Sequence, residues 1–215
     1  MIKVLIVDDH DLVRQGIQKL LEEANDIEVI GEADSGEKAF DLVARLKPEV
    51  ILMDLRMPGI GGMEATTRLI HTYPKIKIIA VTSCDEEPFP TRFLQAGAMG
   101  YITKGAGKEE IVKAIRIVSA GLKYISPDIA QKMALSKFDR NDQSPFDVLS
   151  ERELQVAVMI ISGVRVVDIS EKLYLSSKTI NSYRYRIFDK LQVSSDVELT
   201  LLALRYGLID NIENN

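Results

Sequence analysis

Short apolar runs alternate with amphipathic segments along the first half of the chain. The runs predict five strands, at Lys3–Val7, Ile27–Ala33, Val50–Asp54, Lys77–Thr82 and Gly100–Ile102. Between them, apolar residues recur every three or four positions, the period of a helix with one buried face. Val4–Val7 and Val50–Met53 are apolar throughout, which is typical of strands covered on both sides. The pattern predicts an α/β doubly wound domain with a five-stranded parallel sheet.

The second half of the chain has no such alternation. After a helix at Lys108–Ala120 and a short one starting at Ser126–Pro127, the polar stretch Ser136–Phe146 predicts a linker. Four further helices are expected, at Glu151–Ser162, Val167–Leu173, Ser177–Leu191 and Asp196–Tyr206. We therefore expect an α/β domain over residues 1–122, a short helix and linker over 123–147, and an all-α four-helix domain over 148–215.

Composition indicates a cytoplasmic protein. With 46% hydrophobic residues in 215, the chain is long enough for two packed cores. Its apolar runs are all shorter than the roughly 18 residues that cross a bilayer, so we expect no membrane insertion. The single cysteine, Cys84, has no partner for an internal disulfide, as is usual in a reducing compartment.

Positive charge gathers in one segment, although the formal net charge is −5. Between Ser176 and Lys190, one acid, Asp189, stands against four cations, Lys178, Arg184, Arg186 and Lys190. The acidic balance excludes a uniformly basic coat, so any contact with nucleic acid is expected at this local patch.

Polar residues stand at the ends of the predicted strands. The first strand leads into Asp8 and Asp9, the third ends in Asp54, the fourth in Thr82, and Lys104 follows the fifth. In an open parallel sheet, chemistry takes place beyond these carboxyl ends. Three carboxylates at one edge repel one another, which a hard cation such as Mg²⁺ relieves.

Magnesium needs only one or two carboxylates plus a phosphate, so Asp54 is left to act as a nucleophile toward phosphorus. Lys104 and the Thr82 hydroxyl would then hold the phosphoryl oxygens. We expect Asp54 to be the only carboxylate opposite Lys104. Each residue by itself has an ordinary structural explanation, and only their combination favours a site; His10 is expected to be a surface residue.

Four stretches of the first domain, IVDDH, LMDLRMPGIGG, AVTS and GYITK, resemble the signatures of the response-regulator receiver, which has a flavodoxin-like fold. The resemblance covers residues 1 to about 120 and implies a role for each matching residue. Asp8, Asp9, Asp54 and the backbone carbonyl of Arg56 would bind Mg²⁺. Asp54 would accept the phosphoryl group, Lys104 would contact it, and Thr82 and Tyr101 would act as switch residues.

The predicted helix Ser177–Leu191 has a polar outer face. Ile180, Ile187 and Leu191 lie on one stripe, and the opposite stripe carries Lys178, Ser182, Tyr185 and Asp189. Ser176 is a good N-cap, which leaves the positive end of the helix dipole for a phosphate. Such a helix can enter a major groove, or it can simply be a solvated surface helix.

The runs LSERELQVAVMIISG, VVDISEKLYLS and SKTINSYRYRIFDKL resemble the LuxR-type helix-turn-helix. The resemblance implies that Ser177–Leu191 is the recognition helix, and it assigns DNA contacts to Lys178, Thr179, Asn181, Ser182, Tyr185 and Arg186. It also implies that Val167–Leu173 is the positioning helix. Two features depart from the usual pattern: the common run small-Asn-Lys-Glu-Ile-Ala is here Val166-Val167-Asp168-Ile169-Ser170, and Tyr183 stands where histidine is common. The helical wheel places Arg184 near the buried stripe.

The last predicted helix is apolar on two sides. Leu199, Leu202, Ala203 and Tyr206 form one stripe, and Val197, Leu201 and Leu204 form another. One stripe can close the domain, and the other would be left in water on a monomer. In the resembling family this helix makes a two-fold dimer, so we expect a homodimer on DNA when the protein is active.

A receiver followed by a LuxR-type domain is the layout of the NarL/FixJ class of two-component regulators. The run NSYRYRIF is most similar to the GacA/UvrY branch, which implies a sensor histidine kinase as phosphoryl donor and promoter DNA of small regulatory RNA genes as target. Two functions other than transcription regulation are considered. An aspartyl-phosphate phosphatase would need an acid where Arg56 stands, so we expect no enzyme. A phosphorelay adaptor would use its C-terminal helices to bind protein.

Overall fold

The structure, a computed structural model, describes residues 1–83, 89–139, 144–206 and 208. The chain forms two compact units, Met1–Leu135 and Ser136–Asn215, and each is described by itself. Cys84, the centre of the expected linker at 140–143 and residues 209–215 lie outside the described residues. The domain limits expected at residues 122 and 148 stay predictions.

Among the described residues of the first unit, six parallel strands form one sheet in the order β2-β1-β3-β4-β5-β6. They are β1 (Ile2–Val7), β2 (Ile27–Ala33), β3 (Val50–Met53), β4 (Lys77–Thr82), β5 (Gly100–Thr103) and β6 (Tyr124–Ile125). The predicted parallel class is confirmed, but the predicted number of five strands is wrong. Two residues are too few to show a period of two, and β6 becomes a strand only by pairing with β5.

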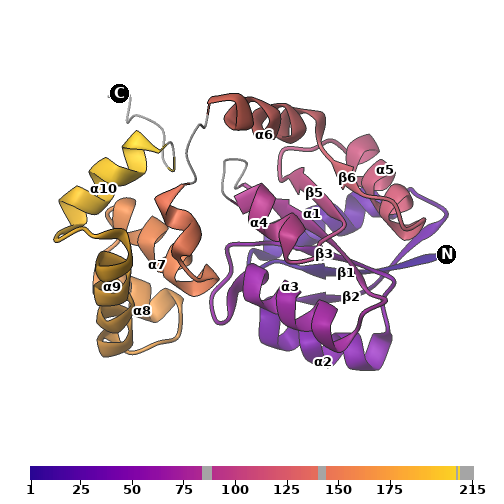
Figure 1. The fold of residues 1–215 in the computed structure, drawn as a ribbon. Coiled ribbons are helices and arrows are strands. Elements are labelled where there is room, and N and C mark those ends of the chain that lie inside the picture. Colours follow the sequence, from indigo (N-terminus) through magenta and orange to yellow (C-terminus); the bar gives the residue numbers. More distant parts are fainter. Residues whose placement is uncertain (84–88, 140–143, 207, 209–215) are drawn as a thin grey trace. The chain divides into compact units, whose positions relative to one another are not determined.

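Helices cover both faces of this sheet (Figure 1). They are α1 (Asp11–Leu21), α2 (Gly36–Leu46), α3 (Gly61–Thr72), α4 (Phe89–Gln95), α5 (Lys108–Ser119) and α6 (Pro127–Asp139). One buried cluster joins the sheet to α1 and α5, and the other joins it to α2, α3 and α4. The doubly wound architecture is therefore confirmed.

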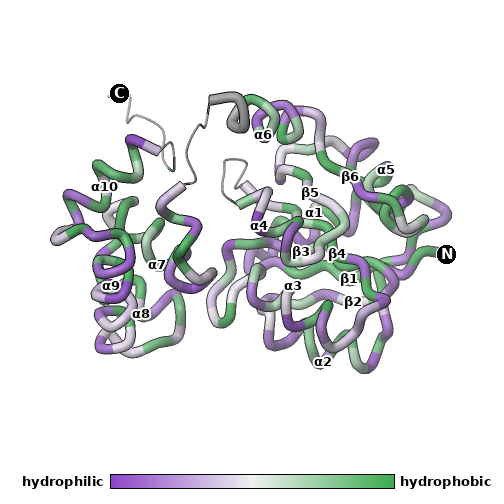
Figure 2. Tube along the Cα trace, viewed as in Figure 1, coloured by the Kyte–Doolittle hydropathy of each residue, from purple (hydrophilic) through white to green (hydrophobic). Residues whose placement is uncertain are grey.

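The buried strands are apolar on both faces because successive side chains enter opposite clusters. In β1, Val4 and Ile6 pack toward α1 and α5, whereas Leu5 and Val7 pack toward α2, α3 and α4. All four are at most 1% exposed. Figure 2 shows the central strands as apolar segments between helices of mixed polarity. Continuous hydrophobicity here reflects burial on two sides, as the sequence predicts.

The order of the strands reverses at β1, which lies between β2 and β3. The chain moves from β1 to one side and returns to the other, so the ends of β1 and β3 are neighbours at the switch point. Predicted to be the last residue of its strand, Asp54 is instead the first residue beyond β3. Its amide still donates to the Val7 carbonyl at 2.8 Å, which ties it to the end of β1.

The loop after Asp54 depends on two glycines. Gly59 has φ of +76°, a left-handed conformation that suits glycine. Gly62, in the first turn of α3, lies so close to the end of β3 that a Cβ there would stand 1.8 Å from the Asp54 carbonyl oxygen. The start of α3 can therefore approach Asp54 only because residue 62 has no side chain.

In the second unit, a short 3₁₀ helix, η1, is followed by four α-helices in the described residues (Figure 1). The bounds are η1 (Pro145–Val148), α7 (Glu151–Ile161), α8 (Val166–Lys172), α9 (Ser177–Leu191) and α10 (Asp196–Arg205). The expected linker Ser136–Phe146 is wrong at both ends, because α6 continues to Asp139 and Phe146 is fully buried in η1. The polar composition of the segment gave no indication that Phe146 is buried.

Serine side chains cap the starts of α7, α9 and α10 in the second unit. Ser150 and Glu153 form a reciprocal capping box at α7, and the Ser176 hydroxyl accepts from the Thr179 amide at the start of α9. The predicted core stripe of α9 is confirmed, because Ile180 and Ile187 are 0% exposed and Leu191 is 7% exposed. In either unit, the helices that the structure describes are too short or too polar to cross a membrane.

We expect Gly62→Ala to destabilise the first unit by about 1–3 kcal/mol, the usual cost of overpacking a close contact. Gly16→Ala is the matched control. Gly16 lies within helix α1, and a Cβ there would have no heavy-atom neighbour within 4 Å. That change should be neutral or stabilising by up to about 1 kcal/mol. Urea denaturation of both variants measures the difference; equal stability would contradict the close approach.

Candidate functional site

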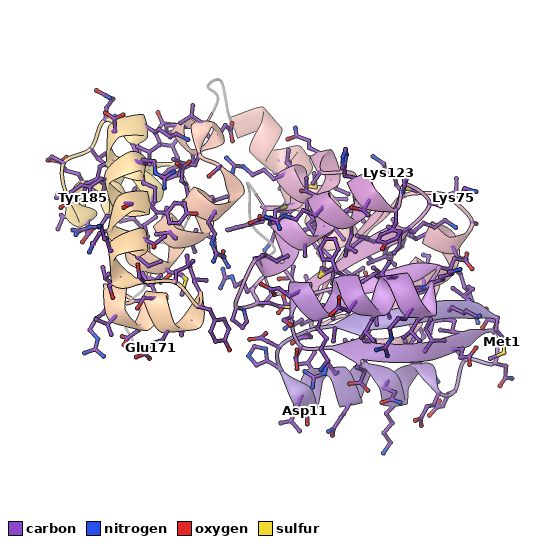
Figure 3. All side chains as sticks on the ribbon, turned by 90° about the horizontal axis from the view of Figure 1, so that it is seen from below. Met1, Asp11, Lys75, Lys123, Glu171 and Tyr185 are labelled. Atoms are coloured by element: carbon purple, nitrogen blue, oxygen red, sulfur yellow. The ribbon has the colours of Figure 1, made fainter. Side chains whose placement is uncertain are left out.

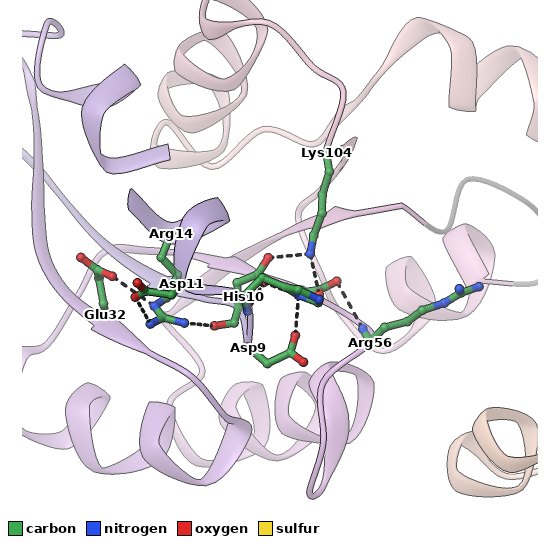
Figure 4. Close-up of polar contacts among 9 residues, drawn as sticks. Asp9, His10, Asp11, Arg14, Glu32, Arg56 and Lys104 are labelled. Carbon is green, nitrogen blue, oxygen red and sulfur yellow. Dashed lines mark hydrogen bonds and ion pairs between the residues drawn. The ribbon is translucent and has the colours of Figure 1, made fainter. Parts of the chain in front are cut away.

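Four residues at the switch point form an acidic cluster. Asp8, Asp9, His10 and Asp54 each present one ligand atom, and these atoms all lie within 4.8 Å of one another. The carboxylates of Asp8 and Asp54 are each only 2% exposed. The Arg56 amide donates to Asp54 Oδ1 at 3.2 Å. The fold therefore brings together the acids that the sequence places at separate strand ends (Figure 4).

Lys104 bridges the two buried carboxylates. Its Nζ lies 2.7 Å from Asp8 Oδ2 and 2.8 Å from Asp54 Oδ2. The expectation that Asp54 is the only carboxylate opposite Lys104 is therefore wrong. Asp8 and Asp54 follow adjacent strands, and one ammonium group reaches both because a lysine can donate three hydrogen bonds. One cation thus compensates two buried charges.

The pKa values at this site depart from their usual ranges. Burial raises the pKa of Asp54, and the hydrogen bond and charge of Lys104 only partly oppose this effect. Burial by itself would lower the pKa of Lys104, but hydrogen bonds to Asp54 and Asp8 outweigh it, so the pKa is raised. The lysine therefore stays charged, and two carboxylates with one ammonium leave room for a further positive charge.

The donor set fits a hard divalent cation. Asp8, Asp9 and Asp54 supply carboxylate oxygens, the ligands that Mg²⁺ prefers. Asp9 Oδ1 is buried and accepts no hydrogen bond from the described residues. His10 is exposed at its side chain (63%), as expected, although its Nδ1 lies 3.2 Å from Asp8 and 3.0 Å from Asp9. The ligand role of the Arg56 carbonyl stays a prediction.

The two predicted switch residues, Thr82 and Tyr101, are fully buried. Thr82 ends β4, and its carbonyl accepts from the Lys104 amide at 2.9 Å, which joins the ends of β4 and β5. Tyr101 lies on β5 and packs edge-on against Phe93 of α4, with ring centroids 5.9 Å apart. The main chain thus links the end of β4 to Lys104, the first residue beyond β5.

Sequence reasoning missed the residues that frame the cluster. Glu37 of α2 accepts from the Ile60 amide at 3.0 Å and so holds the loop after Asp54. Gly62 sets the approach of α3, and Arg14 of α1 donates to the Asp8 carbonyl at 2.7 Å. The paired glycines at 61 and 62 are a visible signal of close packing. Glu37 and Arg14 give no such signal in the sequence, because each acts through a contact with another element of the fold.

The predicted DNA-contact residues lie along α9 with unequal exposure. Lys178, Ser182, Tyr185 and Arg186 are exposed, whereas Thr179 and Asn181 are half-buried. Tyr185 is 69% exposed and is labelled in Figure 3. The hydroxyls of Thr179 and Ser182 are engaged within the helix, by Ser176 and by the Lys178 carbonyl. The outer face is therefore available as expected, with its hydroxyls partly committed.

Two of the four cations of the predicted basic patch serve the second unit's own structure. Arg184 forms two hydrogen bonds of 2.7 Å with Asp196 at the start of α10. Lys190 contacts the buried Glu153 carboxylate at 2.6 Å. The outer face of α9 is therefore less cationic than the sequence suggests, and Arg184 belongs to the inner side, as the helical wheel indicates. Lys178 and Arg186 remain exposed.

Tyr183, which departs from the usual pattern of the resembling family, holds one of these exposed cations. The Arg186 guanidinium lies 4.7 Å from the centre of the Tyr183 ring, and its Nε donates to the Ser182 carbonyl at 3.3 Å. A cation over an aromatic face is attracted electrostatically. Both contacts favour one orientation of the exposed Arg186 side chain along α9.

The last helix, α10, has one buried and one exposed apolar stripe. Leu199 and Ala203 are fully buried, whereas Val197 is 68% and Leu201 60% exposed. The first stripe closes the unit, as the sequence predicts. The second leaves large apolar side chains on the surface of this unit.

Comparison with known proteins identifies both units. Residues 4–116 match the response regulator receiver domain family, and residues 147–203 match the luxR family of bacterial regulatory proteins. Each match covers the functional site described above for its unit. Together the two regions account for most of the chain.

Curated relatives match nearly the whole chain. The response regulator GacA of Pseudomonas syringae pv. syringae (strain B728a) is 59% identical over 211 residues, which cover 98% of this chain and 99% of that protein. The response regulator UvrY of Escherichia coli (strain K12) is 53% identical over 209 residues, covering 97% and 96%. The resemblance to the GacA/UvrY branch is thereby confirmed.

Solved structures agree. An RcsB response regulator from Salmonella typhimurium has a TM-score of 0.69 at 26% identity and covers 93% of this chain and 95% of its own. A complex of the two-component response regulator RcsB with DNA has a TM-score of 0.60 at 26% identity, covering 94% and 96%. The chain therefore belongs to the two-component response regulators that join a receiver domain to a LuxR-type DNA-binding domain.

Proposed function

We propose that a sensor histidine kinase phosphorylates this response regulator on Asp54 and thereby controls its dimerisation and its sequence-specific binding to promoter DNA. The observation that carries the proposal is the Lys104 ammonium 2.8 Å from Asp54 at a buried acidic switch point. We propose residues 1–122 as the receiver, 123–147 as the connection and 148–215 as the DNA-binding domain. Because promoter DNA is its target, we place the protein in the cytoplasm.

In the proposed reaction, an Asp54 oxygen attacks phosphorus and forms an acyl phosphate, while the bond to the donor group breaks. Mg²⁺, held by Asp8, Asp9, Asp54 and the Arg56 carbonyl, supplies charge stabilisation for the transferring group. Lys104, which starts between two carboxylates, is placed to donate to the phosphoryl oxygens. Thr82 donates to the same group, and Tyr101 adjusts its packing as Thr82 moves.

At the other end of the chain, α9 is proposed to enter the major groove. Lys178 and Arg186 contact phosphates, and Asn181, Ser182 and Tyr185 face the bases, with Thr179 at the N-terminal turn. Free backbone N–H groups at a helix start favour a nearby phosphate. The DNA complex of RcsB supports this docking. We propose promoters of small regulatory RNA genes as targets, as the resemblance of the run NSYRYRIF to the GacA/UvrY branch implies.

Dimerisation is proposed through the exposed stripe of α10. Val197 and Leu201 would leave water when two copies meet about a two-fold axis. A solved structure of two RcsB dimers bound to two parallel DNAs supports dimers on DNA. Because Arg184 joins α9 to the start of α10, pairing of the α10 helices would fix the spacing of two recognition helices.

Acetyl phosphate with Mg²⁺ should add one acyl phosphate to the full chain, and Asp54→Ala should abolish it. Mass spectrometry of intact and digested protein checks both the number and the position, which matters because Asp8 also faces Lys104. Only the carboxylate attacks, and burial raises the pKa of Asp54, so labelling should fall as the pH is lowered toward that pKa. Undiminished labelling of the alanine variant would remove Asp54 from this role.

Asn181→Ala and Tyr185→Ala should each reduce discrimination between a cognate and a scrambled site by about 1–3 kcal/mol, because base contacts carry sequence information. Lys178→Ala should weaken both sites alike and reduce the salt slope by about one. Binding isotherms at several salt concentrations measure both effects, with the exposed Lys123 of the first unit changed to alanine as control. The opposite division of effects would contradict the assigned roles.

Leu201→Glu should weaken the dimer and, with it, binding to a site with two half-sites, because a charge would replace an apolar contact. Sedimentation of the phosphorylated chain measures the dimer constant. The matched control is Leu122→Glu, at a leucine of similar exposure (63% against 60%) in the first unit. If both variants dimerise like the wild type, another surface forms the interface.

A further inference from the structure

We infer that Arg14 is a positioning residue for the acidic pocket: its guanidinium holds the Asp8 carbonyl and thereby fixes the loop that carries Asp8 and Asp9. The inference rests on the proposed Mg²⁺ site. It concerns a residue outside that site, because Arg14 contacts Asp8 through the main chain and not through the carboxylate.

Backbone hydrogen bonds hold the two ends of the loop in question: the Asp8 amide donates to the Ala33 carbonyl at 3.1 Å, and the His10 carbonyl accepts from the Val13 and Arg14 amides at 3.1 and 3.2 Å. None of these bonds involves the Asp8 carbonyl. Only Asp8, Asp9 and His10 separate the end of β1 from the start of α1. His10 is the N-cap residue of α1, and its side chain makes no capping hydrogen bond. This described loop therefore lacks the side-chain cap that usually fixes the start of a helix. Asp9 Oδ1 accepts no well-aligned hydrogen bond from the described residues, although Nδ1 of the exposed His10 ring lies 3.0 Å from it. The peptide between Asp8 and Asp9 therefore needs another contact to define its orientation.

Arg14 supplies that contact, and hydrogen bonds to two other residues fix the orientation of its guanidinium. Nη1 donates to the Asp8 carbonyl at 2.7 Å, Nε to Glu32 of β2 at 3.1 Å, and Nη2 to Asp11 of α1 at 2.7 Å. The side chain of Arg14 is only 13% exposed. A guanidinium has a planar, rigid set of donors, so three acceptors on three segments define its orientation.

Asp8 is consequently held at both ends. Figure 4 shows Arg14, Asp11 and Glu32 gathered on one side of the loop, and Lys104 and Arg56 on the other. On the Lys104 side, the Asp8 carboxylate also accepts from the His10 amide at 2.9 Å. If the carbonyl were released, the Asp8–Asp9 peptide could rotate and displace the Asp9 carboxylate. Outer contacts of this kind orient metal ligands.

The sign of the effect on Mg²⁺ binding separates positioning from simple charge. Arg14 is a cation near a cation site, so electrostatics by itself predicts that removing the charge tightens Mg²⁺ binding. Positioning predicts the reverse. Arg14→Lys adds a second distinction, because lysine keeps the charge but cannot reproduce the planar fork, and it should therefore also weaken binding.

The experiment measures the Mg²⁺ dissociation constant of the full chain by calorimetry, at constant ionic strength and without a phosphoryl donor. Arg14→Gln should weaken binding about 10-fold or more, and amide exchange at His10 should become faster. Arg116→Gln is the matched control, because Arg116 makes an equally direct pair with Asp26 at 2.8 Å, away from the pocket. The Arg116 side chain is 53% exposed against 13% for Arg14, so this control should lose less stability, and it should keep its Mg²⁺ affinity.

An Arg14→Gln affinity equal to or tighter than that of the wild type would overturn the inference, whatever its stability. If this variant does not fold, Glu32→Ala decides, since it removes one acceptor that orients Arg14. It should weaken Mg²⁺ binding to a lesser degree and speed amide exchange at His10, and unchanged affinity or unchanged exchange overturns the inference. Asp9→Asn tests the site itself. If the wild type and Asp9→Asn bind Mg²⁺ equally, the proposed metal site fails independently of Arg14.

Discussion

Two carboxylates buried at one edge of a parallel sheet are the constraint on which the first unit depends. Asp8 and Asp54 are each 2% exposed, and burying an unpaired charge costs several kcal/mol. A single ammonium, that of Lys104, lies within hydrogen-bonding distance of both. The compensation is incomplete, since one positive charge faces two negative ones with Asp9 beside them. A cluster that is left short of positive charge is suited to take up a cation, and an incoming phosphoryl group can then engage the lysine.

The surroundings of this cluster are arranged to keep it in place. Arg14 holds the main chain of Asp8, Glu37 holds the loop after Asp54, and Gly62 lets α3 approach the Asp54 carbonyl. None of the three contacts a reacting atom. They matter because a carboxylate that must meet both a cation and phosphorus has to be oriented in advance. Lys104 itself depends on the Thr82 carbonyl, which fixes the end of β5.

The second unit divides its cations between structure and recognition. Arg184 forms an ion pair with Asp196 of α10, and Lys190 forms one with Glu153 of α7. These pairs link α9 to both helices. Lys178 and Arg186 stay exposed on α9, and the Arg186 guanidinium lies over the Tyr183 ring. A helix that inserts into a groove must be held firmly by its own domain, because its side chains read base edges only from a defined position. The link from Arg184 to α10 couples that position to the helix proposed to form the dimer.

The amino-acid sequence by itself determined the parallel α/β class, the helical C-terminal unit, the core stripe of α9 and the candidate pocket residues, because burial on one or two faces leaves a periodic record in the chain. Matching motifs also indicated the family that the comparisons confirm. Only the tertiary structure decided that Lys104 serves Asp8 as well as Asp54, that β6 joins the sheet, that Phe146 is buried, and that Arg14 and Arg184 are engaged. These features are contacts between segments distant in the chain or between single polar side chains, and such contacts have no period and no local signal.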